Sequence, residues 1–211
     1  MPAFEAIYDV RYGPLRGTMI LRLSRLGDRH VYETSLEPRG IATLLRRGII
    51  YEMTTLEISG SEVRPLDYIQ TDTIADPPRV AHYFFDAATV GGIYKGRQFE
   101  EPMRVGGQNR ISAQVALMHS LRHSRPLSEF AIFDRARWKE YEFDILPSKQ
   151  VKTASGNYEA VEARYAERDD DKSTSIYFAP ALEWLPVMIV YREGGRDKSR
   201  AILKQYSLIS P

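Results

Sequence analysis

The chain contains no cysteine among its 211 residues, which excludes disulfide bonds and thiolate nucleophiles. It has no apolar run close to the ~20 residues that a membrane-spanning helix needs. It also lacks a charge imbalance, since 29 Lys and Arg against 28 Asp and Glu leave a formal charge of +1. We therefore expect no membrane span and no nucleic acid among its partners, and no overall attraction to acidic membranes.

Recognisable catalytic and cofactor motifs are missing as well. Neither Gly91-Gly92 nor Gly106-Gly107 is followed by the Lys-Ser or Lys-Thr of a phosphate-binding loop. There is no Gly-x-Ser-x-Gly sequence, the pattern that exposes a nucleophilic serine on a sharp turn. The sequence thus predicts no cofactor and no catalytic residue, and it favours a protein that is not an enzyme.

The N-terminal part alternates apolar and polar residues with the period of two that is typical of half-buried strands. Phe4, Ala6, Tyr8, Val10 and Tyr12 share one face, and two further strands are expected up to Leu36. A hairpin is expected through Ser59-Gly60. A short helical turn could occupy residues 41–46.

Residues 138–208 read as a run of antiparallel strands with little between them. A turn at Ser155-Gly156-Asn157, a charged turn at 168–172 and a Gly194-Gly195 turn separate the strands. One convincing helix is expected over residues 109–122, with apolar residues at spacings of three and four and Asn109 as its N-terminal cap. At 43% apolar residues, we expect a single domain, 1–211, of the mainly β class, in which this helix packs against the sheet.

The order of these pieces resembles a known bacterial family, domain of unknown function 3108. The resemblance rests on Tyr8–Gly13, on Gly107–Leu117, and on the segment from Tyr141-Glu-Phe-Asp-Ile145 through Ile176–Pro180 to Leu185-Pro186-Val187. It implies a strongly curved antiparallel sheet, like the open barrels of lipocalins and lipoprotein carriers, and an exported protein of the cell envelope. The family pattern leads us to expect Asp where this chain has Asn109.

Three groups of polar residues could carry chemistry, although a structural interpretation is favoured for each. His119 and His123, four residues apart on a helix, could ligate zinc, but the neighbouring Glu of a metalloprotease motif is replaced by Ser120. Asp169-Asp170-Asp171 could attract a cation, but a solvated turn is the simpler interpretation. Glu140, Glu142 and Asp144 fit the polar face of a strand. We predict no metal site.

Aromatic residues offer the more informative pattern, with 13 Tyr, 8 Phe and 2 Trp. The concave face of a curved sheet that bears aromatic side chains can enclose an apolar, lipid-like ligand. The candidate ligand-binding residues are Tyr141, Phe143, Trp138, Trp184 and Tyr177.

The favoured hypothesis is an exported envelope protein that binds a hydrophobic ligand or a partner segment in this concavity. The alternatives are a structural protein that acts through a surface or an edge strand, as a homodimer or otherwise, and an enzyme of unrecognised type. The start at Met1-Pro2-Ala3 suits a chain whose export signal has been removed, and it suits a cytoplasmic protein equally well.

Overall fold

A computed structural model describes residues 1–45, 47–60, 62–125, 130–167 and 171–209. The described part contains one sheet of 15 strands, a principal helix α2 and two short helical turns. The N-terminal strands are β1 (Phe4–Tyr12), β2 (Leu15–Leu26), β3 (Arg29–Arg39), β4 (Ile50–Ser59), β5 (Glu62–Asp72), β6 (Arg79–Phe85), β7 (Thr89–Tyr94) and β8 (Arg97–Pro102). The others are β9 (Gln108–Asn109), β10 (Phe130–Asp134), β11 (Arg137–Thr153), β12 (Gly156–Glu167), β13 (Lys172–Ala179), β14 (Leu185–Glu193) and β15 (Arg196–Leu208). The helical elements are α1 (Ala42–Leu45), α2 (Ser112–Arg122) and the 3-10 turn η1 (Pro180–Leu182).

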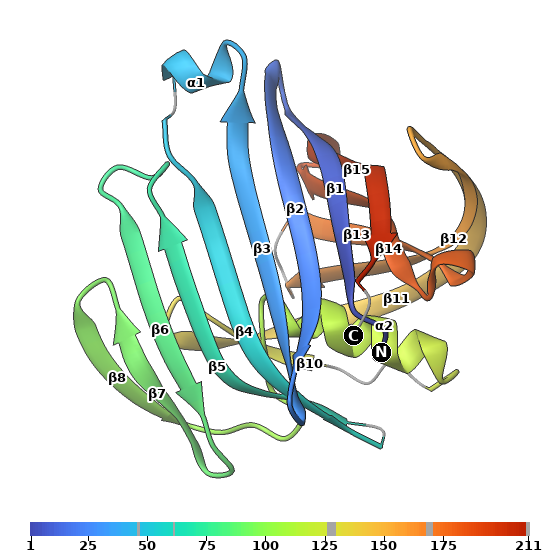
Figure 1. The fold of residues 1–211 in the computed structure, drawn as a ribbon. Coiled ribbons are helices and arrows are strands. Elements are labelled where there is room, and N and C mark those ends of the chain that lie inside the picture. Colours follow the sequence, from blue (N-terminus) through green and yellow to red (C-terminus); the bar gives the residue numbers. More distant parts are fainter. Residues whose placement is uncertain (46, 61, 126–129, 168–170, 210–211) are drawn as a thin grey trace.

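The sheet order places almost every strand beside its neighbours in the chain. The order runs β8-β7-β6-β5-β4-β3-β2-β1-β15-β14-β13-β12-β11-β10-β9, so the first and last strands pair with each other. All pairs are antiparallel except the short β9–β10 pair. The β1–β15 pair joins two walls, β1–β8 and β9–β15, which curve towards each other around a concave interior (Figure 1). This open, strongly curved sheet is the predicted fold class.

The inward faces of the two walls and one face of α2 form the core. Tyr8, Tyr32, Tyr68 and Tyr83 lie fully buried on β1, β3, β5 and β6 of the first wall. Phe133 of β10 makes edge-on ring contacts with Tyr83 and with other aromatic residues around it, which locks the far wall onto the near one. The aromatic alternation in the sequence is therefore largely a core pattern.

Most predicted elements of the N-terminal wall are present. The β2–β3 and β4–β5 hairpins follow the expected alternation, and the second turns at Gly60. The expected helical turn at 41–46 is the four-residue α1. In the charged turn at 168–172, residues 168–170 lie outside the described residues.

The helix begins at Ser112, three residues later than the sequence suggested, because Asn109 organises a turn ahead of it. Oδ1 of Asn109 accepts hydrogen bonds from the backbone N–H groups of Ile111 and Ser112, at 3.1 and 2.8 Å. In return, the Ser112 hydroxyl lies 2.8 Å from the Asn109 backbone N–H, which donates to it. The residue directly before the helix is Ile111, which makes no side-chain cap, so the predicted cap at Asn109 is displaced. Asn109 instead binds the backbone N–H groups of the turn that leads into the helix, in a reciprocal arrangement with Ser112.

The amide of Asn109 has a second task that a carboxylate could not perform. Its Nδ2 donates a hydrogen bond of 2.9 Å to Oγ1 of Thr54, which itself donates to the backbone oxygen of Asp67. The Thr54 hydroxyl already donates its only proton to Asp67, so it can only accept a hydrogen bond, and residue 109 must be the donor. Both Asn109 and Thr54 are completely buried. This explains why Asn suits this chain where the family pattern suggested Asp.

We predict that Asn109→Asp lowers the free energy of unfolding by about 2 kcal/mol at pH 7, because a buried carboxylate oxygen would face the lone pairs of Thr54. The loss should shrink at low pH, where a protonated carboxyl regains a donor. Urea unfolding monitored by tryptophan fluorescence at pH 7 and pH 4.5 measures this difference. Asn157→Asp, at an exposed position in β12, is the matched control; an equal loss in both variants would contradict the interpretation.

Candidate functional site

A cavity of about 640 Å³ lies between the two walls. Its lining comes from strands β2, β3 and β4 of the first wall, from the residues that precede and begin α2, and from β10, β11, β12, β13 and β14 of the second wall. The volume falls in the range of about 300–1,000 Å³ that is usual for small-molecule sites. The concavity is therefore only partly filled by the core and α2.

The lining is divided by chemistry. Apolar aliphatic side chains come mainly from the first wall: Met19, Leu21, Leu36 and Ile50, joined by Ile111, Ile132 and Ile189. All five cationic side chains come from the other side of the cavity, namely Arg110, Arg135, Arg137, Lys139 and Lys172. The carboxylates are Glu52, Asp134 and Glu167. Among the described lining residues, the five cations thus outnumber the three carboxylates.

Arg110, which lies between β9 and α2, is one of the cations that line the cavity. Its Nη2 lies 3.5 Å from Oε2 of Glu52, which is almost fully buried and accepts a 2.6 Å hydrogen bond from the Tyr68 hydroxyl. The negative charge of Glu52 raises the pKa of Arg110 further above its already high value. Even so, 45% of the Arg110 side chain remains accessible to solvent, and the residue lines the cavity.

The β10–β11 hairpin supplies three of the other cations, Arg135, Arg137 and Lys139, and Lys172 begins β13. Lys139 is held by Glu167 at 2.9 Å and Asp134 at 3.7 Å, and its side chain is largely buried. Arg137, two residues earlier on the same face of β11, makes no ion pair or hydrogen bond with the residues that the structure describes. It is exposed at the cavity and can offer its guanidinium to an anion.

The five predicted aromatic ligand residues have different places. Tyr141 lines the cavity, and burial raises the pKa of its hydroxyl to about 12. Phe143 stacks at 5.3 Å on Tyr165, a cavity residue that also makes an edge-on contact with Tyr141. The structure thus brings Tyr141 and Phe143 together around Tyr165, which the sequence reasoning did not select.

The other three predicted residues lie away from the cavity lining. Trp138 donates from Nε1 to the backbone oxygen of Pro102 at 2.9 Å, and its ring fits against Gly107, where an added Cβ would lie only 2.4 Å from it. Trp184 follows η1 in a left-handed backbone conformation and packs on the core. Tyr177 is buried on the opposite face of β13. A ligand role for the five stays a prediction.

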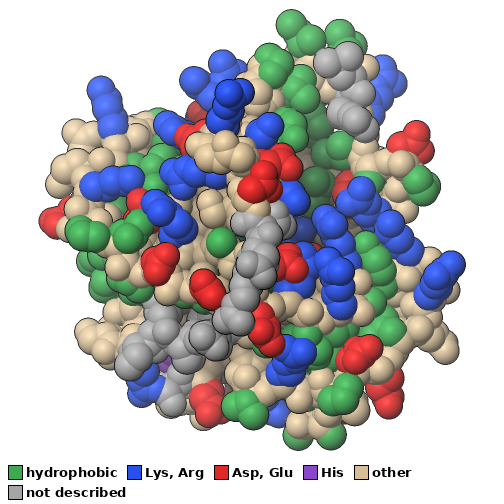
Figure 2. Space-filling model, turned by 180° about the vertical axis from the view of Figure 1, so that it is seen from behind, with side chains coloured by type: hydrophobic (Ala, Val, Ile, Leu, Met, Phe, Trp, Pro, Cys, Tyr) green, Lys and Arg blue, Asp and Glu red, His purple; other side chains and the backbone are tan. Residues whose placement is uncertain are grey.

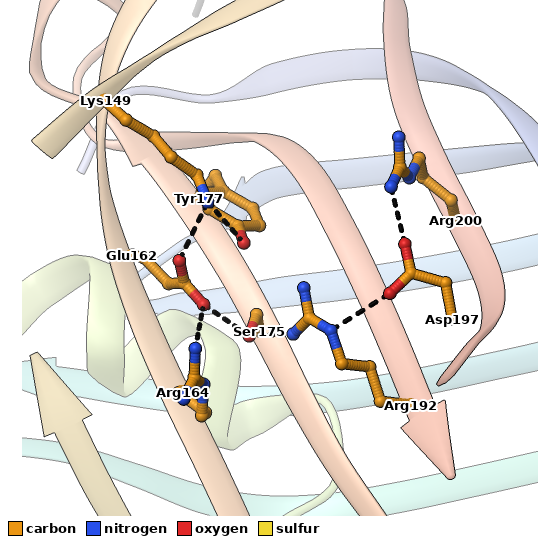
Figure 3. Close-up of polar contacts among 8 residues, drawn as sticks. All are labelled: Lys149, Glu162, Arg164, Ser175, Tyr177, Arg192, Asp197 and Arg200. Atoms are coloured by element: carbon orange, nitrogen blue, oxygen red, sulfur yellow. Dashed lines mark hydrogen bonds and ion pairs between the residues drawn. The ribbon is translucent and has the colours of Figure 1, made fainter. Parts of the chain in front are cut away.

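Tyr177 belongs to a polar cluster on that opposite face of β11–β15 (Figure 3). At its centre is Glu162, which accepts hydrogen bonds from Ser175 at 2.7 Å, Lys149 at 3.1 Å and Arg164 at 3.2 Å. Lys149 also donates to the Tyr177 hydroxyl at 3.0 Å. Burial opposes the ionisation of Glu162, but these donors outweigh it and lower its pKa to about 2.

This cluster is an ion-pair network, in which Nε of Arg164 lacks a hydrogen-bond partner among the described residues, and it does not have the properties of a catalytic site. A carboxylate with so low a pKa is a poor general base at neutral pH. Arg192 extends the network, since its Nη1 donates to the Ser175 hydroxyl at 2.7 Å and its Nε to Asp197 at 3.0 Å. The cluster ties β11, β12, β13, β14 and β15 together from behind the cavity (Figure 3).

The two helix histidines make backbone contacts. His119 Nε2 lies 3.0 Å from the backbone oxygen of Gly60, and His123 Nδ1 lies 2.8 Å from the backbone oxygen of His119. Burial lowers the pKa of His119. Within the described ranges, no group of three or more His, Asp or Glu side chains is placed to hold a metal ion.

Comparison with known proteins agrees with the architecture. Residues 7–194 match the family described as "Protein of unknown function (DUF3108)". The chain belongs to this family. The fold is similar to a crystal structure from Brucella abortus, described as a beta-barrel-like protein of domain of unknown function DUF1849. The TM-score is 0.66 at 10% sequence identity, with 100% of this chain and 99% of that chain covered.

No curated protein matches this DUF3108 chain. In the described residues, no helix has both the length and the apolar character needed to cross a bilayer.

The sequence reasoning missed the cationic side of the cavity. A signal was present, because Arg135, Arg137 and Lys139 alternate through a strand start as residues on one face do. Arg110 offered no such signal, since its partner Glu52 lies 58 residues away in the chain.

We predict that Glu162→Gln lowers the free energy of unfolding by about 2 kcal/mol at pH 7, since it removes a buried charge that cationic donors surround. The folded-state pKa is depressed, so the contribution is present above about pH 4.5 and is lost as the pH falls towards 2. Wild type and variant should therefore converge in acid. Urea unfolding from pH 7 to pH 3 measures this, and Glu159→Gln, exposed on the same strand, should change little. A constant difference over the whole range would contradict the assignment.

Proposed function

We propose that this DUF3108 protein is a non-catalytic binding protein whose ligand is a small amphipathic molecule with an anionic group, held in the cavity between the two walls. The observation that supports it is the division of the lining. Aliphatic side chains of β2, β3 and β4 face cations of the segment before α2, of the β10–β11 turn, and of β11 and β13. An apolar tail would lie against the first wall, and its anionic group would lie near Arg110 and Arg137.

The energetics favour this orientation of the ligand. Covering aliphatic lining gains roughly 25 cal/mol for each Å² removed from water. The anionic group would meet Arg137, which needs no existing ion pair to be broken, and the solvent-accessible part of the Arg110 side chain. Glu52 already neutralises part of the Arg110 charge, so Arg137 is the better choice for a test. A purely apolar ligand would displace water from these cations without offering them a hydrogen bond or a counter-charge, which is unfavourable.

Dodecanoate and dodecanol provide matched probes, because they share the chain and differ in charge. We expect Arg137→Gln to weaken dodecanoate binding about fivefold, corresponding to roughly 1 kcal/mol, and to leave dodecanol binding unchanged. Isothermal titration calorimetry measures both. Arg97→Gln, an exposed arginine in the β7–β8 hairpin away from the cavity, is the control.

The apolar side requires a separate variant. Leu36→Gln should weaken binding of both probes by a similar factor, roughly fivefold for about 1 kcal/mol of lost apolar contact. Leu26→Gln, at the exposed end of β2, should bind like wild type. The proposal fails if neither probe binds the wild-type protein, or if binding is indifferent to all four substitutions.

The setting that we propose is the bacterial cell envelope, which the family resemblance implies. A lipid-like ligand with an acidic group fits such a setting, since envelopes are rich in amphipathic anions. Fractionation of cells that produce the protein from its full reading frame should place it outside the cytoplasm. Its recovery with cytoplasmic markers alone would contradict this part of the proposal.

A further inference from the structure

Four arginines lie directly opposite one another on four neighbouring strands. Arg200 of β15 pairs in register with Arg11 of β1, Arg11 pairs with Arg16 of β2, and Arg16 pairs with Arg39 of β3. Residues in such positions project from the same face of a sheet, with Cβ atoms about 5 Å apart. All four are exposed, on the face opposite to the one that carries the core residues Tyr8 and Leu21.

This arginine row is only partly neutralised. Asp197 pairs with Arg200, and Asp9 lies 3.8 Å from Arg39. The side chains of Arg11 and Arg16, in the middle of the row, have no ion pair or hydrogen bond with any residue that the structure describes. Like charges placed directly opposite one another destabilise a sheet. The arginine row therefore does not stabilise the fold, whereas binding of an external polyanion would relieve the repulsion between its charges.

An apolar tip stands at the end of the same row. Arg39 ends β3, and the chain then enters the α1 turn, where Ile41 is 77% and Leu44 is 74% exposed. The turn projects beyond the ends of the strands, and hydrophobic side chains gather at this tip (Figures 1 and 2). Arg47, also exposed, follows immediately. Two large aliphatic side chains are thus presented to solvent with cations on both sides in the sequence.

We propose that this end of the molecule, made of Arg11, Arg16, Arg39, Ile41 and Leu44, docks onto an anionic phospholipid surface. The arginines would meet lipid phosphates, and the α1 tip would enter the boundary between headgroups and acyl chains. The two features suit the same occupant, because a bilayer surface offers a plane of negative charge above an apolar layer. The net charge of +1 gives no overall attraction, so binding depends on this local row.

The docking surface is distinct from the cavity but close to one side of it. Met19 and Leu36 line the cavity from the inner face of β2 and β3, three residues from Arg16 and Arg39 respectively, and Ile50 follows α1 in the chain. A molecule docked through α1 would hold the aliphatic side of the cavity next to the membrane. The inference concerns membrane attachment and does not depend on what the cavity binds.

Flotation with vesicles of phosphatidylcholine alone or with added phosphatidylglycerol tests the proposal. We expect binding only to the anionic vesicles and weaker binding as salt is raised. Arg11→Gln with Arg16→Gln should reduce the bound fraction to the level seen with neutral vesicles, a loss of roughly tenfold or more in partition constant. Ile41→Ser with Leu44→Ser should lower the constant at least fivefold.

Two double variants serve as matched controls. Arg29→Gln with Arg97→Gln removes the same charge from the exposed first residues of β3 and β8. Leu26→Ser with Ile93→Ser removes exposed apolar side chains away from α1. Both should bind anionic vesicles like wild type. The proposal is overturned if the wild-type protein does not bind anionic vesicles. That outcome includes the case in which α1 forms a contact between two copies of the chain instead of a contact with lipid. It is also overturned if control and test variants lose binding equally. None of these variants should lower the unfolding midpoint, because every site is exposed. Arg11→Gln with Arg16→Gln should raise it slightly, because it removes two like charges that face each other in the sheet.

Discussion

The pairing of β1 with β15 is the constraint on which the rest of the structure depends. Every other neighbouring pair in the sheet is formed by segments close in the chain, whereas this pair joins Phe4 to Leu208 and Tyr12 to Ser199. It makes one sheet of two meanders and fixes their relative curvature. The cavity exists because of this pair, since its aliphatic residues on β2, β3 and β4 and its cations on β11 and β13 belong to different meanders.

Local pattern was sufficient to predict the mainly β class and most of the strands, because nearly all strands pair with their neighbours in the chain. The strong curvature of the sheet was implied by the family resemblance. Alternation of period two marked the strands of residues 4–36 and 138–208, and the Gly-containing turns marked the hairpins. The helix was found from its apolar spacing, but its predicted cap, Asn109, lies in the turn that leads into it. Its start was misplaced by one turn, because the reciprocal bonds between Asn109 and Ser112 use the residues that would otherwise form the first turn.

The site was harder to predict, for a physical reason that β13 illustrates. Tyr177 and Phe178 point to opposite faces of that strand, and both are buried, at 1% and 0% exposure. When both faces of a strand are covered, alternation does not say which face looks into a cavity. Tyr141, a predicted ligand residue, lines the cavity, and its ligand role stays a prediction. Arg110 required knowledge of Glu52, a partner brought close only by the complete fold.

The β1–β15 seam has a consequence for the order in which the chain can fold. Hairpins of the first wall can pair as soon as they are synthesised, but β1 has only one neighbour until the last residues of the chain are available. Contacts of such large sequence separation are slow to form. Until then β1 presents an open edge, a template for pairing with another chain. The acquisition of the seam is therefore the step at which aggregation competes with folding, and at which a chaperone would be most useful.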